Sequence, residues 1–459
     1  MITKHTPDKT AALIVAVFSS FLAPFMGSSV NVALPIIGKE FAMDAILLSW
    51  ITTAYLLAAS ALLVPFGRLA DIHGRKKIFT IGIWIFSIGA VLTAFADSST
   101  QLILCRIFQG IGSAMIFSTG LAILTSVFPP HERGKVLGIN IGSVYLGLLL
   151  GPFFGGLLTE HLGWRSLFVA TLPLSIVVIL LLLSKEMKGD WAEAKGERFD
   201  ITGSVIYVTA IVALMSGFSE LPETRGALLL LAGIIGIALF LILESRISSP
   251  VLSLTIFRNN RTFTFSNAAA FINYSATFAS GFLLSLYLQY IKAMSPQQAG
   301  TVLMAAPAIM AFISPFAGRL SDRIEPRAVA TAGMSLNVVG LMLYALLNES
   351  SSATFIIFSL LLNGLGFGLF SSPNTNAIMG SVDSAYLGVA SGTNATMRAT
   401  GMVFSMGIAM LIFALYIGRV EITPESYPEF LVSMRIIFVI FTILCAIGSV
   451  ASFAGRRKH

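Results

Sequence analysis

Long apolar segments alternate with short polar segments along the whole chain. A helix needs about 20 consecutive apolar residues to cross a bilayer. Fourteen such segments lie roughly at 11–33, 46–67, 77–96, 101–125, 136–158, 165–184, 201–219, 226–243, 264–290, 298–317, 328–347, 352–376, 388–416 and 432–454. They are far longer than barrel strands and do not alternate residue by residue. The pattern predicts an all-α polytopic membrane protein with fourteen transmembrane helices.

The composition supports a membrane protein, since 56% of the 459 residues are hydrophobic and only 11% are charged. The net charge of +7 does not predict nucleic-acid binding, because Lys and Arg lie mainly in the short loops between spans. With the N-terminus inside, 21 of the 29 basic residues lie on the cytoplasmic side, six on the other side and two within spans. The positive-inside rule therefore predicts a multi-pass inner-membrane protein with both termini in the cytoplasm.

Two similar phrases divide the chain. "PFGRLADIHGRKK" begins at Pro65, and "PFAGRLSDRIEPR" begins at Pro315. They follow the second and the tenth apolar segments, so they mark equivalent points of two six-helix sets separated by two additional helices. Parallel repeats of this kind are typical of transporters that carry a substrate site between two halves. We expect an N-terminal bundle at 1–184, a linker with two additional helices at 185–263 and a C-terminal bundle at 264–459.

The first phrase contains residues suited to a tight, charged turn. Gly67 and Gly74 permit unusual backbone angles, and the Asp71 carboxylate can pair with a guanidinium such as that of Arg75. Asp322 is the corresponding acid of the second phrase. Contacts of this kind can lock the two halves in one state and break in another. The alternative is that these charges only set the topology.

Three motifs carry a resemblance to a known family. "GRLADIHGRKK" resembles the signature loop of the major facilitator superfamily, "LILCRIFQGIGSA" resembles its helix-four pattern, and "GLLLGPFFGG" resembles its helix-five antiporter motif. With fourteen predicted spans, the chain is similar to the fourteen-helix drug:proton antiporter subgroup of multidrug efflux type. The resemblance implies a secondary transporter that exports amphipathic or drug-like small molecules by alternating access, coupled to protons.

The helix-five motif also has a physical meaning of its own. Gly147, Gly151 and Gly155 are spaced by four and so share one helix face, where glycine permits close approach of another backbone. Pro152 removes a backbone donor. The resemblance implies that this helix lies at the interface between the two halves and takes part in gating.

The chain departs from the subgroup at one position. Met26 stands where the subgroup usually has an acid in the first helix, and no Asp or Glu lies in the middle of any predicted span. A proton-coupled exporter of cations usually needs a carboxylate in its path. Either coupling runs through an acid at the rim, for which Asp44 and Glu40 are candidates, or the protein is a non-proton-coupled facilitator or importer of a neutral or anionic metabolite.

Polar side chains within the spans supply the other candidates. An arginine inside a span is costly unless it faces the interior or snorkels to the surface, and Arg106 is close enough to a span end for either. Amide and phenol groups prefer the bundle interior, whether they line a cavity or tie helices together. The candidates for coupling or substrate contact are Arg106, Gln109, Arg398, Asn31, Asp44, Tyr145, Asn273, Tyr287 and Asn374, and Tyr274 belongs to the same expected lining.

The sequence lacks the patterns of other functional classes. It has no phosphate-binding lysine loop and no cluster of metal-ligating residues. We therefore expect no enzyme activity, no cofactor and no metal. The expected partners are a small-molecule substrate, protons as the coupling ion and the lipid bilayer, with no nucleic acid, and we expect a monomer.

Overall fold

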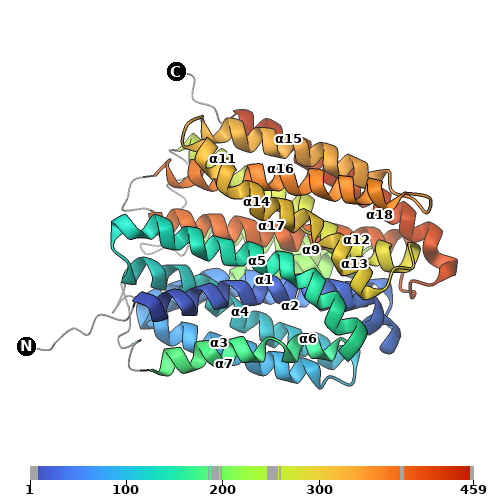
Figure 1. Cartoon of the computed structure of the whole chain (residues 1–459), viewed down its shortest axis with the longest axis horizontal. Helices are drawn as coiled ribbons and strands as arrows, with labels where there is room; N and C mark the ends of the chain where they lie inside the picture. The colour runs from blue at the N-terminus through green and yellow to red at the C-terminus, as the bar shows by residue number, and fades with distance from the viewer. Residues whose placement is uncertain are drawn as a thin grey trace, which may run out of the picture.

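The computed structural model shows an elongated bundle of helices that run side by side (Figure 1). It describes residues 9–184, 199–245, 260–382 and 387–454, together with Met187, Gly196 and Phe257. Within these residues, fourteen helical stretches are long and apolar enough to cross a membrane, and no strand is present. The predicted all-α polytopic fold is confirmed. Within the predicted segment 185–263, residues 185–198 and 246–259 lie outside the described residues, apart from Met187, Gly196 and Phe257.

The first helical group contains the helices before the predicted linker. Its members are α1 (Lys9–Glu40), α2 (Ala45–His73), α3 (Arg75–Ala94), α4 (Ser99–Val127), α5 (Pro130–Leu162), α6 (Arg165–Val169) and α7 (Leu172–Leu183). In this group α1 packs along α5, while α2 and α3 both pack on α4. The group therefore forms a bundle of its own.

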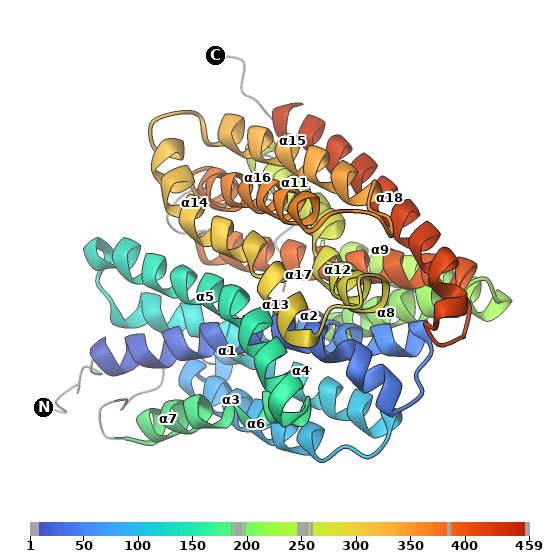
Figure 2. The same cartoon turned by 45° about the vertical axis from the view of Figure 1, so that its right-hand side comes forward.

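The second helical group follows an inserted pair of helices, α8 (Ile201–Glu220) and α9 (Thr224–Glu244). Its members are α11 (Arg261–Thr277), α12 (Ser280–Leu286), the π-helix η2 (Tyr287–Ile291), α13 (Pro296–Leu303), α14 (Ala305–Ser321), α15 (Pro326–Ala345), α16 (Ala353–Met379), α17 (Leu387–Tyr416), the 3₁₀-helix η4 (Pro424–Ser426) and α18 (Tyr427–Ala454). The two groups lie against each other, with α5 and α14 on one side of the contact and α2 and α17 on the other (Figure 2). The inserted α8 contacts both α2 and α17.

Three of the predicted spans are broken into shorter helices. After α6, the new helix α7 begins at Leu172, and Pro173 lies in its first turn, where a missing N–H does no harm. Between α11 and α12 the N–H of Ala279 donates to the Ser405 Oγ of α17 at 3.0 Å. The third break separates α13 from α14 at Met304. Hydropathy alone does not reveal such breaks, because the apolar pattern runs through them.

The helices define two ends of the bundle. The start of α1 lies toward the left of Figure 1, and α2 returns to the same end of the bundle after a short turn. We call this end the terminal face. Glu40 and Leu162, at the ends of α1 and α5, lie at the other end, which we call the opposite face. The two ends differ in how closely the helical groups meet.

Candidate functional site

The two helical groups are bonded to each other near the opposite face. Between α12 or η2 and α1, Ser285 Oγ donates to the Asn31 carbonyl at 2.7 Å, and Gln289 Nε2 donates to the Val32 carbonyl at 2.9 Å. Both acceptors are main-chain groups of α1. The closure therefore depends on the path of the α1 backbone rather than on a particular α1 side chain.

Helices α5 and α13 cross in direct backbone contact, which closes one seam between the groups. A Cβ added to Gly156 of α5 would overlap the Pro296 carbonyl, and one added to Gly300 of α13 would overlap the Pro152 carbonyl. Only glycine allows two helices to approach so closely. We call this contact the α5–α13 seam.

A second seam lies between α2 and α17. The Ala45 N–H donates to the Val420 carbonyl at 3.1 Å near the opposite face, and Ser60 Oγ donates to the Ala399 carbonyl at 3.1 Å deeper in the bundle. The side-chain and main-chain hydrogen bonds described above that join the two groups lie at the level of Ser60 or nearer to the opposite face.

The gap between α5 and the second group becomes wider toward the terminal face. Pro152 and Gly156 lie on the face of α5 that meets the second group, and they touch α13. One or two turns further toward the terminal face, Tyr145 and Gly142 follow at helical spacing, and then Gly138. A Cβ added to Gly142 or Gly138 would find no atom within 4 Å. The space beside α5 therefore widens from the crossing toward the terminal face.

A cation and several aromatic rings meet in the middle of this space. The Arg398 guanidinium of α17 lies 4.9 Å from the centre of the Tyr274 ring of α11. Tyr145 of α5 and Ser371 of α16 belong to two other helices and lie within electrostatic range of the Tyr274 hydroxyl. Phe367 packs edge-on to the Tyr274 ring at 5.3 Å. We call Arg398, Tyr274 and Tyr145 the central cluster, and it combines side chains from both groups.

The sequence predicted Arg398, Tyr274 and Tyr145 as members of the lining, but it gave no reason to group them. Their distance along the chain is large, and no motif links them. Phe367 and Ser371 lie in "GLGFGLFSSP", within α16. Helical spacing from Asn374 could have identified Ser371, because the two residues are three positions apart on α16.

Arg106 is fully buried, with 0% of its surface exposed, so it does not snorkel. Its Nε donates to the Ile51 carbonyl at 3.3 Å, and its Nη1 donates to the Gln109 Oε1 at 2.5 Å. Its guanidinium lies 4.2 Å from the centre of the Tyr55 ring, whose hydroxyl is 2.7 Å from Ser113 Oγ. Arg106 and Gln109 therefore join α2 to α4 inside the first group and lie apart from the central cluster.

Two further candidates lie inside the second group. Asn337 Nδ2 donates to the Asn273 Oδ1 at 3.1 Å, which joins α15 to α11. The Tyr287 hydroxyl donates to the Asn348 carbonyl at 2.7 Å near the opposite face. These side chains tie helices and loops of one group together.

The remaining candidates are also distributed. Asn31 accepts at Oδ1 from Thr52 Oγ1 at 3.1 Å, within the first group. Asp44 caps α2 by accepting from the Leu47 N–H at 2.8 Å, and it lines a polar pocket of about 320 Å³ at the opposite face. Asn374 is buried on α16. The structure thus brings Arg398 and Tyr145 together around Tyr274. It pairs Arg106 with Gln109 at a separate place, and it distributes the other candidates elsewhere.

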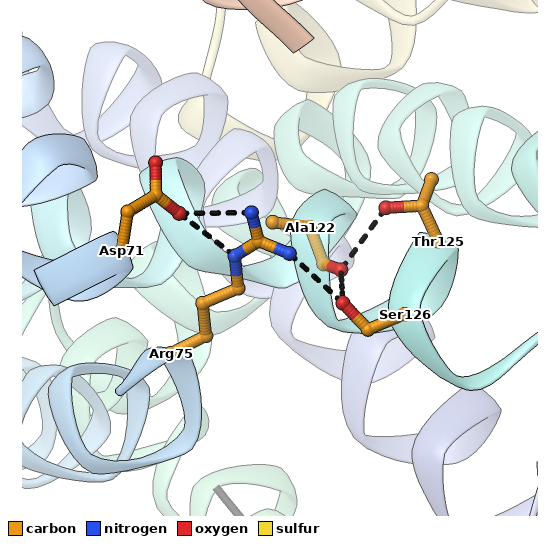
Figure 3. Close-up of polar contacts among 5 residues, drawn as sticks. All are labelled: Asp71, Arg75, Ala122, Thr125 and Ser126. Carbon is orange, nitrogen blue, oxygen red and sulfur yellow. Dashed lines mark hydrogen bonds and ion pairs between the residues drawn. The ribbon is translucent and has the colours of Figure 1, made fainter. Parts of the chain in front are cut away.

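The first charged phrase forms an ion pair at the terminal face (Figure 3). Arg75 Nε and Nη2 lie 2.9 and 2.8 Å from the Asp71 Oδ1, and Arg75 Nη1 donates to Ser126 Oγ at 2.9 Å. Gly74, between α2 and α3, has a φ of 110°, which strongly favours glycine. This pair binds the turn to α4 of the same group, so it does not join the two groups in this structure, and its gating role stays a prediction.

The second phrase is held in a corresponding way. Asn376 Nδ2 of α16 donates to the Asp322 Oδ1 at 3.0 Å and to Ser321 Oγ at 2.9 Å. In each group the end of the helix that carries the phrase is thus tied to a neighbouring helix end, α2 to α4 and α14 to α16. Gly67, which precedes Asp71 by one turn, has open space around it except for Ser118.

The helix-five glycines face α1 rather than the second group. A Cβ added to Gly147 would lie 2.6 Å from the Phe21 carbonyl, and one added to Gly155 would lie 2.8 Å from the Ser29 Cα. Ser29 Oγ donates to the Gly151 carbonyl at 2.9 Å. Only the adjacent face of the motif, with the Pro152 carbonyl and Gly156, meets the second group. The expectation that α5 lies at the interface therefore fits this face and not the three glycines spaced by four.

The acids of the spanning helices lie at helix ends. Among the described residues, each Asp or Glu on a spanning helix is in its first or last turn. Met26 is fully buried in the apolar core. Glu40 accepts from Trp164 Nε1 at 2.6 Å and pairs with Arg165 Nη1 at 2.7 Å, within the first group. The middle of the bundle, as far as it is described, holds cations and phenols but no carboxylate.

Comparisons with known proteins agree with this architecture. Residues 16–406 and 266–459 match the family model described as Major Facilitator Superfamily. The chain is 31% identical to the riboflavin transporter RibZ of Clostridioides difficile over 456 residues, which cover 98% of each protein. It is 30% identical to the multidrug resistance protein Stp of Mycobacterium tuberculosis, over 87% of this chain and 74% of that protein.

Other similarities point the same way. The chain is 27% identical to the cephamycin export protein CmcT of Amycolatopsis lactamdurans over 89% of its length and 86% of that protein. The crystal structure of the nucleoside transporter NupG has the same fold, with a TM-score of 0.63 at 15% identity, covering 98% of this chain and 100% of that chain. From the family match and from these relatives, the chain belongs to the major facilitator superfamily of membrane transporters.

Proposed function

We propose that the protein is a secondary transporter that moves amphipathic aromatic small molecules across the inner membrane by alternating access. The observation that carries this proposal is the central cluster, in which Arg398, Tyr274 and Tyr145 come from helices of both groups. Aromatic faces suit a planar substrate, and a guanidinium suits a neutral acceptor or an anion. A site shared by two groups changes its access when the groups move relative to each other.

The proposed orientation places the terminal face in the cytoplasm, as the distribution of Lys and Arg in the loops suggests. Residues 1–184 and 264–459 then form the two moving halves, and residues 185–263 contain the inserted pair. With the seams closed at the opposite face, this conformation is open to the cytoplasm. It is the conformation that would load a substrate for export.

Two forms of this function differ in coupling. Proton-coupled export is supported by the helix-five motif and by relatives named as multidrug and export proteins. With Met26 at the subgroup's acidic position, the coupling acid would lie at a helix end, and strong cations are poor substrate candidates. The second form is a facilitator or importer of a neutral or anionic metabolite, which Met26 and the relative named as a riboflavin transporter favour.

The test uses purified protein in liposomes with an imposed pH gradient. Riboflavin is the first probe because it is a neutral planar aromatic molecule with its own fluorescence, and a lipophilic cationic dye is the second. Accumulation of either probe against its gradient, with loss of the pH gradient, supports proton-coupled export. Movement of riboflavin only down its gradient supports the facilitator.

An internal control links flux to the central cluster. The Arg398→Gln variant should lose most transport, whereas Arg419→Gln, which removes a guanidinium from a loop at the opposite face, should retain it. If Arg398→Gln transports like the unaltered protein, the central cluster is not the substrate site.

A further inference from the structure

The two seams occupy equivalent places in the repeat. The α5–α13 seam joins the end of the fifth span to the start of the tenth, and the other joins the end of the thirteenth span to the start of the second. Six-helix sets related in this way place these two contacts on opposite sides of one axis. Because the two seams are equivalent in the repeat, a contact that is present in one and absent from the other points to a role specific to that seam.

The α5–α13 seam contains a carboxylate that crosses between the groups. Glu160, in the last turn of α5, accepts at Oε2 from Ser295 Oγ at 2.6 Å and from the Gln297 N–H at 2.9 Å. Ser295 is the N-cap of α13, and Gln297 lies in the first turn of that helix. The unpaired N–H groups and the positive end of the helix dipole make this position favourable for an ionised carboxylate.

The seam between α2 and α17 has no such group among the described residues. Its contact at the opposite face is the main-chain bond from Ala45 to Val420, and the neighbouring Asp44 caps its own helix. Behind this contact, Ile46 of α2, Met215 of α8 and Met410 of α17 belong to one buried apolar cluster. The inserted pair thus supports this seam, while the α5–α13 seam depends on charge.

We propose that Glu160 is a latch residue, which holds the opposite face closed while it is ionised and releases the α5–α13 seam when a proton from the opposite face neutralises it. The seam between α2 and α17, whose contacts described above are hydrogen bonds to main-chain carbonyls and apolar packing, then acts as the hinge. A neutral acid makes weaker bonds to Ser295 and to the helix start than a carboxylate does. Glu160 is exposed, so solvent protons reach it.

Few side chains near the Glu160 carboxylate can take up a proton and so cause a pH effect. Ser295 and Gln297 face it from the second group, and neither titrates. His161, the next residue of α5, interacts electrostatically with Glu160. The ring nitrogen Nε2 of His161 lies 3.2 Å from the Gln297 Oε1. A His161→Gln background therefore separates titration of Glu160 from that of the histidine.

The test measures the distance between the two groups at the opposite face, so it requires no substrate. Spin labels are placed through Phe95→Cys and Leu346→Cys, two exposed positions away from the seam, after Cys105 and Cys445 are replaced by Ala. The full chain is studied in lipid nanodiscs between about pH 7.5 and about pH 3, a range that extends well below the pKa of an ordinary glutamate. The distance measurement does not depend on transport, so it can support or overturn the latch even if the transport assay fails. Only the role of the latch as a step of transport rests on the proposed function.

If Glu160 is a latch, the two spin labels should lie at a short distance at the higher pH. On acidification, the fraction of molecules with a long distance between the labels should grow. Glu160→Gln should lower the ratio of closed to open protein about tenfold at the higher pH, the effect of losing charge-assisted bonds, and should remove the pH dependence. Ser295→Ala should also lower the ratio of closed to open protein. Glu349→Gln, a carboxylate on a loop of the opposite face, should behave like the unaltered protein. Identical distance distributions for Glu160→Gln and the unaltered protein would overturn the proposal, as would unchanged pH dependence in that variant.

Discussion

Gly156 of α5 and Gly300 of α13 lie face to face where their helices cross. A Cβ on Gly300 would stand 3.4 Å from the Gly156 Cα and would overlap the Pro152 carbonyl beside it. Because the two glycines belong to different helical groups, a larger residue at either position disturbs the contact between the groups before it disturbs the packing within one.

Gly156→Val should therefore shift the protein away from the conformation described here without unfolding it. The added side chain cannot fit against the main chain of Pro296. We expect a several-fold fall in transport with a nearly unchanged thermal unfolding midpoint. Gly142→Ala, on the same face of α5 but in open space, is the matched control and should transport normally. A large fall in the unfolding midpoint of Gly156→Val would show that the crossing serves stability instead.

Asp71→Asn should slow the transport cycle while membrane insertion stays intact. The substitution removes the ion pair with Arg75 but keeps a side chain of the same shape. Since the Asp71 side chain is 35% exposed, the pair contributes little to stability, about 1 kcal/mol or less. Transport rate and the amount of protein in the membrane should be measured together, with Asp97→Asn at the opposite face as the control. Normal transport by Asp71→Asn would contradict a gating role.

Gly74→Ala tests the turn between α2 and α3. The backbone there has a φ of 110°, and a side chain in such a region costs about 1 to 3 kcal/mol. We expect a lower unfolding midpoint and poorer expression. Gly138→Ala places the same methyl group in open space within a helix, where alanine is the better helix former, and should be neutral or slightly stabilising. Equal midpoints for the two variants would show that the turn relaxes without strain.

Arg106→Ala should destabilise the first group. The guanidinium is fully buried and bonds to Ile51 and Gln109, so its removal leaves polar groups without partners, at a cost of about 2 kcal/mol or more. Thermal unfolding in detergent measures this loss, and Arg225→Ala, at an exposed helix end, is the control. Unaltered stability with lost transport would instead place Arg106 in the coupling path.

The apolar pattern predicted the fourteen spans because a lipid environment leaves little choice of structure for such segments. The broken spans could not be predicted in the same way. The interruption at Ala279 depends on Ser405, a hydroxyl far away in the sequence. Breaks of this kind are set by contacts between helices and not by the local pattern.

The candidate site was predicted only in part for a similar reason. Arg398 and Tyr145 could be identified because polar groups in apolar spans tend to face the interior. Asn273 and Tyr287 satisfied the same criterion, yet they bond to Asn337 and Asn348 inside the second group. Burial of a polar group does not show which neighbour satisfies it, so the sequence could not separate lining residues from ties between helices.

The position of α8 makes the two flanks of the transporter unequal toward the bilayer. On one flank α8 covers the line where α2 meets α17, and α9 packs on the outside of α8. On the other flank, no described helix covers the line where α5 meets α14 from the lipid side. A lipid tail or an apolar solute diffusing in the bilayer therefore meets two additional helices on the first flank, whereas on the second flank it meets α5 and α14 themselves.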